Sequence, residues 1–255
     1  MTSIIAITNQ KGGVGKTTTS VNLAYFLAKA GKKTLLVDFD PQGNATSGLG
    51  IDKQQLGATM TEVITGQIPM ENVILPTDFK RLFLAPSTPH LANTEVELAQ
   101  AEGRFVRLRR ALEKLEGYDY IIIDSPPSLS LLTVNGLIAA RYVLIPVQAE
   151  FYALEGMGQL IETMKLIRKG LNPQLEILGV LPTMMDSRTT LSGQVHDEIK
   201  KHFPDRIFKT TIPRNIRLAE APSHGVPVGD YDRFSKGARA YKLLTKEVME
   251  RIGEA

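Results

Sequence analysis

The chain has 255 residues, of which 43% are hydrophobic and 22% are charged, as is ordinary for a globular protein. It contains no cysteine, which excludes disulfides, thiolate-bound iron–sulfur clusters and cysteine-based zinc sites. The sequence shows neither a signal peptide nor an apolar run of about 18 residues, so no membrane-spanning segment is expected. The net charge of +3 comes from residues 186–255, which carry 13 Lys and Arg against 10 Asp and Glu, whereas residues 1–185 carry 17 of each.

Short apolar runs alternate with longer amphipathic stretches along the chain. In chain order, we expect strands at 3–8, 34–39, 82–85, 120–124, 142–147 and 177–181, with a last short one at 209–212, and helices over 17–30, 95–115, 154–169, 191–203 and 235–252. This alternation predicts an α/β fold with a doubly wound, mostly parallel sheet and helices on both faces. Loops and short helices are expected over 42–80. The chain has no Pro-, Gly- or Ser-rich linker, which favours a single domain over 1–255.

The first predicted strand leads into a glycine-rich segment that opens the first helix: Lys11-Gly12-Gly13-Val14-Gly15-Lys16-Thr17-Thr18. Glycines let backbone N–H groups turn towards an anion, and the helix N-terminus adds its dipole and free N–H groups. Lys16 would then meet the β and γ phosphates, and the Thr17 hydroxyl would bind Mg²⁺. The common motif G-x-x-x-x-G-K-[ST] has a glycine where this chain has Gln10. The segment is therefore predicted to be a phosphate-binding loop of unusual type.

Two further predicted strands end in acidic residues. Asp38 and Asp40 share one face by the two-residue period of a strand, and Asp124 ends the strand at 120–124. In an open parallel sheet the ligand lies beyond the carboxyl ends of the strands, so we expect these acids near Mg²⁺ and the attacking water. Taken singly, each acid could instead cap the turn that follows it. The segment Ser125-Pro126-Pro127 is either a γ-phosphate sensor or a rigid turn.

The loop Lys11-Gly12-Gly13-Val14-Gly15-Lys16-Thr17 resembles the deviant Walker A motif of the ParA/MinD class of ATPases. The resemblance covers nearly the whole chain, and residues 40–50, 151–156 and 212–223 are more similar to chromosomal ParA (Soj-type) proteins than to MinD. It implies a P-loop ATPase fold, with ATP and Mg²⁺ as cofactors. The other interpretation of Lys11, the extra lysine of this loop, is a solvated loop charge.

The resemblance also implies roles for the site residues. Lys11 reaches across a dimer interface to the partner's nucleotide, and with Lys16 and Asp40 it belongs to the catalytic set. Asp40 positions or activates the attacking water. Asp124 resembles the Walker B aspartate that holds the metal, and Asp38 supports the metal shell. The segment made by Pro213, Arg214 and Asn215 matches the one that lies near the adenine.

At the level of function, the resemblance implies an ATP-dependent homodimer that hydrolyses ATP slowly and acts in chromosome or plasmid segregation. The ATP dimer binds double-stranded DNA without sequence specificity and is stimulated by a ParB-type partner, so a cytoplasmic, nucleoid-associated protein is expected. Arg188 and Arg217 match family positions associated with DNA contact, and Lys242 lies in the same basic quarter. Ordinary surface charge is the alternative interpretation of these three residues.

Two relatives of the class offer alternative functions. A cargo-positioning ParA relative would share the chemistry but not the partner. A MinD-like regulator would bind membrane through its last helix, but residues 241–255 lack Trp and Phe and carry Glu247, Glu250 and Glu254. We therefore expect a closing helix packed on the core and no membrane partner. Because the first strand starts at residue 3, the N-terminal DNA-reading domain of large plasmid ParA proteins is not expected.

Overall fold

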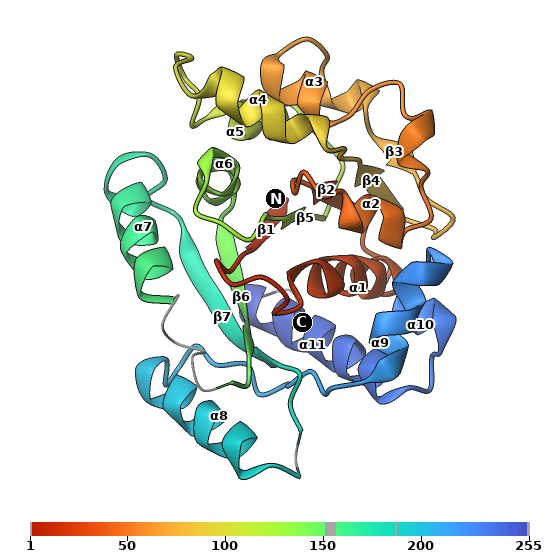
Figure 1. The fold of residues 1–255 in the computed structure, drawn as a ribbon, viewed down its shortest axis with the longest axis vertical. Coiled ribbons are helices and arrows are strands. Elements are labelled where there is room, and N and C mark those ends of the chain that lie inside the picture. Colours follow the sequence, from red (N-terminus) through yellow and green to blue (C-terminus); the bar gives the residue numbers. More distant parts are fainter. Residues whose placement is uncertain (1, 151–156, 187, 254–255) are drawn as a thin grey trace.

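The computed structural model describes residues 2–150, 157–186 and 188–253. Within them, seven strands form one sheet in the order β3-β4-β2-β5-β1-β6-β7, and every neighbouring pair is parallel except β3–β4 (Figure 1). The strands are β1 (Ser3–Ile7), β2 (Thr34–Asp38), β3 (Leu75–Pro76), β4 (Leu82–Ala85), β5 (Tyr120–Asp124), β6 (Tyr142–Gln148) and β7 (Glu176–Thr183). The predicted doubly wound, mostly parallel sheet is confirmed.

Helices cover both faces of the sheet. They are α1 (Lys16–Lys29), α2 (Asn44–Gly48), α3 (Met60–Thr65), α4 (His90–Leu98), α5 (Arg107–Leu112), α6 (Leu131–Ala139), α7 (Met157–Gly170), α8 (Thr190–His202), α9 (Ile216–Glu220), α10 (Val228–Tyr231) and α11 (Lys236–Ile252), with short 3-10 turns at Lys53–Gln55, Met70–Asn72 and Ala221–His224. Alternate residues of a strand face opposite sides of the sheet, so the core has two parts. Ile121 and Ile123 of β5 pack in the part that includes α3–α8, and Ile122 packs in the part that includes α1, α2, α10 and α11.

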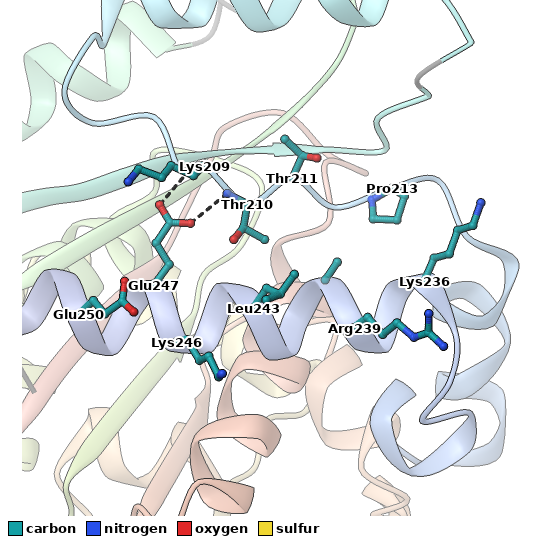
Figure 2. Close-up of a pocket in the computed structure, with 11 residues that line it drawn as sticks. Lys209, Thr210, Thr211, Pro213, Lys236, Arg239, Leu243, Lys246, Glu247 and Glu250 are labelled. Carbon is teal, nitrogen blue, oxygen red and sulfur yellow. Dashed lines mark hydrogen bonds between the residues drawn. The ribbon is translucent and has the colours of Figure 1, made fainter. Parts of the chain in front are cut away.

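Two predicted elements differ from the structure. The helix expected over 95–115 is split into α4 and α5, because the chain turns between them at Gly103, whose φ of 68° lies in the left-handed region. No strand forms at residues 209–212, all of which are described. The N–H groups of Lys209 and Thr210 donate to the Glu247 carboxylate at 2.8 and 2.9 Å instead of to a neighbouring strand (Figure 2).

The closing helix α11 packs on the core, as predicted. Tyr241, Leu244 and Val248 are buried in the cluster that includes α1, while Leu243 stays exposed. No helix in the described ranges has the length and apolar character needed to cross a bilayer. The start of the predicted helix 154–169, and the family-like residues 151–156, lie outside the described residues. The region 42–80 holds short helices, as expected, together with the edge strand β3, which the sequence analysis missed along with α6.

Candidate nucleotide site

The glycine-rich loop lies between β1 and α1 and has the backbone that an anion site needs. Gly13 and Gly15 have φ values of 75° and 89°, in the left-handed region that glycine adopts without strain. Gly15 precedes α1 and no described side chain caps this helix, so its first N–H groups remain free for a phosphate. The loop is fixed from β7, where the Thr183 hydroxyl donates to the Val14 carbonyl at 2.9 Å. Thr183 was not among the predicted site residues.

The two loop lysines point in different directions. Lys16 is buried, and its Nζ donates to the backbone carbonyl of Lys11 at 3.0 Å. Burial lowers the pKa of Lys16, and the negative charges of Asp124 and Asp40 partly offset this. Lys11 turns its Nζ towards the Glu150 carboxylate, at 2.8 Å. Lys16 therefore stays inside its own loop, whereas Lys11 lies at the edge of the site.

Asp38 and Asp124 lie directly opposite each other on the neighbouring strands β2 and β5. Both carboxylates are fully buried, and this burial raises the pKa of each above its ordinary value. Asp38 Oδ2 accepts hydrogen bonds from the Thr46 N–H and the Thr46 hydroxyl, both at 2.7 Å, and Oδ1 accepts the Asp40 N–H at 3.4 Å. Through these hydrogen bonds Asp38 holds the start of α2 beside the site.

Asp124 has one carboxylate oxygen to spare. Its Oδ1 accepts a hydrogen bond from the Ser20 hydroxyl at 2.9 Å, whereas its Oδ2 is buried and accepts none of normal geometry from the described residues. The hydroxyls of Thr17 and Ser20 lower the pKa that burial raises. A buried carboxylate oxygen without a partner beside Thr17 fits Mg²⁺ or a water bound to it. Since no three His, Asp or Glu side chains of the described residues form a metal cage, phosphates and water would supply the other ligands.

Asp40 follows β2 and is also largely buried. Its Oδ1 accepts the Gln42 N–H at 2.9 Å, and its charge acts on Lys16, Asp38 and Asp124. The structure therefore brings the predicted catalytic and metal residues to one edge of the sheet. The role of each residue in catalysis or metal binding stays a prediction.

The predicted adenine segment reaches the same edge from β7. Pro213 bridges to Met185, and the Arg214 N–H donates to the Met185 carbonyl at 3.1 Å. The positive charge of Arg214 contributes to lowering the pKa of Glu150, the acid that Lys11 contacts. Asn215 is the N-cap residue of α9, with its Oδ1 buried and without a partner among the described residues. The segment thus lies beyond the C-terminal end of β7, the strand whose Thr183 contacts the loop.

The three predicted DNA-binding residues lie on separate elements. Arg188, after β7, donates from Nε and Nη2 to the Asp186 carboxylate at 2.9 and 2.7 Å. Arg217 of α9 pairs with Glu220 at 2.8 Å and lies 3.5 Å from Asp232. Lys242 lies on α11, where it belongs to an exposed row that we call the basic face of α11: Lys236, Arg239, Lys242 and Lys246. Figure 2 shows Lys236, Arg239 and Lys246 of this face. Lys246, four residues after Lys242, was not among the predicted DNA-binding residues.

Comparisons with known proteins show the family of the chain. Residues 2–177 match the family model described as "AAA domain". The chain is 55% identical to the sporulation initiation inhibitor protein Soj of Bacillus subtilis, over 97% of this chain and 98% of the relative. It is 51% identical to the chromosome partitioning protein ParA of Myxococcus xanthus, over 97% of this chain and 88% of the relative.

Among solved structures, that of cobyrinic acid a,c-diamide synthase from Mycobacterium smegmatis with bound ATP analog and magnesium superposes with a TM-score of 0.90. The two chains are 38% identical, and the match covers 99% of this chain and 96% of the other. The predicted cofactors ATP and Mg²⁺ are therefore confirmed. The chain belongs to the AAA-domain family and, within it, to the Soj/ParA chromosome-partitioning ATPases.

Proposed function

We propose that this partitioning ATPase works as an ATP-dependent homodimer whose ATP form binds double-stranded DNA without sequence preference. A ParB-type partner stimulates its otherwise slow ATP hydrolysis. The observation that carries the proposal is Lys11: the loop holds two lysines, but Lys16 alone turns inward, and Lys11 extends to the edge of the site. A loop lysine so placed is available to a nucleotide that another subunit holds.

The catalytic roles follow from the positions of the side chains. Lys16 neutralises the β and γ phosphates from inside the loop, and Lys11 adds positive charge in trans where the leaving phosphate becomes negative. Thr17 and the free oxygen of Asp124 would hold Mg²⁺, which would supply positive charge to stabilise the phosphates. Asp40 orients the attacking water, because it follows β2 at the sheet edge and lies close enough for its charge to act on Lys16 and Asp124. Asp38 acts indirectly, because it accepts hydrogen bonds from Thr46 and so holds α2 beside the site.

The residues that hold the nucleotide come from both ends of the chain. The phosphates lie against the backbone of residues 12–18, and the adenine lies against the segment of Pro213, Arg214 and Asn215. Support for the second contact is that this segment borders the same sheet edge as the loop.

DNA contact is proposed for the basic face of α11, with Arg188 and Arg217 as further contacts. Among the described residues, none of the four side chains of the basic face makes an ion pair, so their charges are available to phosphates. Arg188 and Arg217 must first leave or share their carboxylate partners. DNA binding of this kind would place the ATP form on the nucleoid.

The test is retention of the full chain on random-sequence duplex DNA with ATP and Mg²⁺, with ADP and Mg²⁺, and without nucleotide. We expect retention with ATP alone, an affinity that falls as salt rises, and no preference among sequences. Equal retention in all three conditions, or none with ATP, refutes the proposal. Capture of proteins on the ATP-bound Asp40→Ala variant then separates a ParB-type partner from a different cargo.

A further inference from the structure

Lys11 is held in place by an acid of its own chain. Its Nζ lies 2.8 Å from Glu150 Oε2, in a pair whose side chains are 40% and 47% exposed. Glu150 follows β6, and its other oxygen accepts a hydrogen bond from Gln148 of that strand. Hydrogen bonding from Lys11 lowers the pKa of Glu150, so the acid is ionised at neutral pH. The carboxylate is therefore a fixed, charged partner for the lysine.

A second contact fixes the backbone that carries Lys11. The Lys11 N–H donates to Asn9 Oδ1 at 3.0 Å, and Asn9 Nδ2 donates to the Pro146 carbonyl of β6 at 2.7 Å. Asn9 is buried, so this backbone link to β6 is shielded from water. With the backbone held, the partner of Lys11 is decided by the rotamers of its side chain. Because the Lys11 ammonium lies 2.8 Å from Glu150, a phosphate in another subunit must compete with this carboxylate for it.

From this competition we infer that Glu150 is the positioning residue of Lys11: it keeps the lysine on its own subunit and so opposes ATP-dependent dimerisation. The inference rests on the proposed role of Lys11 in trans. Each protomer that enters the dimer must first break its own Lys11–Glu150 contact. The dimer equilibrium therefore includes two such losses.

The surroundings of Glu150 lower the free-energy cost of separating Lys11 from it. Besides Lys11, the positive charge of Arg214 acts on this carboxylate. When the Lys11–Glu150 contact breaks, the negative charge of Glu150 is still compensated, because Arg214 of the proposed adenine segment remains as a cation nearby. The exchange of one cation for another would link dimerisation to the segment that contacts the nucleotide base.

The expected change in the dimer equilibrium follows from the solvent exposure of the Lys11–Glu150 pair. A half-exposed ion pair shifts an equilibrium by about 1.4- to 5-fold. With one pair in each of two protomers, loss of the pair should tighten the dimer by about 2- to 25-fold. Glu150 thus tunes the ATP concentration at which dimers form, without being required for them.

The experiment compares the wild-type chain with Glu150→Gln, which removes the charge but keeps the shape. Glu198→Gln is the matched control, because Glu198 forms an equivalent exposed pair with Lys201 at 2.9 Å on α8, away from the loop. The first measurement is the rate of acetylation of Lys11 by limiting acetic anhydride in the nucleotide-free protein, with the exposed Lys242, which neither variant touches, as internal reference. The second is the dimer dissociation constant from sedimentation with a slowly hydrolysed ATP analogue and Mg²⁺.

We expect Glu150→Gln to raise the acetylation rate of Lys11 by about 1.4- to 5-fold and to tighten the dimer. Glu198→Gln should change neither, and Glu150→Asp should fall between wild type and Glu150→Gln. Unchanged acetylation in Glu150→Gln overturns the inference, as does faster acetylation with an unchanged or weaker dimer. If the wild-type chain forms no dimer with the analogue, the proposed function fails, while acetylation still decides whether Glu150 holds Lys11. Equal melting temperatures of the variants exclude a folding defect as the cause.

Discussion

Thr46 connects three backbone segments at the edge of the nucleotide site, and its removal is the sharpest test of how the site is built. Its hydroxyl donates to Asp38 Oδ2 at 2.7 Å and accepts the Ser87 N–H at 3.0 Å, and both Thr46 and Ser87 are fully buried. Thr46→Val keeps the shape but removes both bonds. The loss comprises one hydrogen bond to a carboxylate, about 1.5–3 kcal/mol, and a buried N–H without a partner, about 1–3 kcal/mol. Allowing for relaxation, we expect the free energy of unfolding to fall by about 2–4 kcal/mol.

The assay is urea denaturation of the nucleotide-free protein followed by circular dichroism, with Thr46→Ser as the control that restores the hydroxyl. Thr46→Ser should recover most of the stability. ATP turnover should fall in Thr46→Val beyond any loss of folded protein, because α2 begins four residues after Asp40 and is fixed through Asp38. A free energy of unfolding within about 0.5 kcal/mol of wild type would refute the reasoning, since it would mean that the buried groups find other partners.

Further predictions concern the charged groups. Asp40→Ala should bind ATP and dimerise but lose turnover by about 10²–10⁴-fold, measured as phosphate release; an unchanged rate contradicts the assignment. Lys16→Ala should weaken ATP binding by about tenfold or more, whereas Lys11→Ala should bind ATP as a monomer, and calorimetry with sedimentation distinguishes the two. Burial raises the pKa of Asp124 above its unfolded value, so its contribution to stability is fully present below about pH 4 and is lost as the pH rises through the raised pKa. Asp124→Asn should therefore flatten the decline of unfolding free energy with pH in nucleotide-free protein, and a decline equal to that of wild type would contradict this.

The parts of the site that depend on residues close together in the chain could be predicted from the sequence. A glycine-rich loop between a strand and a helix, and acids at the ends of apolar strands, are encoded within a few residues, so Lys16 and Asp124 could be placed at one sheet edge. Thr46 and Ser20 could not be found in this way. Their partners Asp38 and Asp124 are 8 and 104 residues away, and hydroxyl residues on helices carry no periodic signal.

The same limit explains the errors in secondary structure. Residues 209–212 have strand-like composition, but Glu247, 38 residues further on, takes the N–H of Lys209. The contact of Lys11 with Glu150 spans 139 residues and depends on β6 lying beside β1. Local patterns predict an element, whereas the partner of an N–H group or an ammonium depends on the topology of the sheet.

The position of α11 bears on how ATP could control DNA binding. The Tyr241 hydroxyl lies 3.1 Å from the Thr19 hydroxyl of α1, and both residues are buried, so α11 is fixed to the helix that begins at the phosphate loop. Its basic face is thus fixed relative to the phosphate loop, and control by ATP should come from pairing two such faces in a dimer. The slope of log K against log salt is about −0.9 for each neutralised phosphate. Four contacts per protomer give a slope of about −3.6 for a monomer and about −7 for a dimer. We therefore expect the weak DNA binding of Lys11→Ala with ATP to show about half the wild-type slope, and equal slopes would mean that ATP rearranges α11 itself.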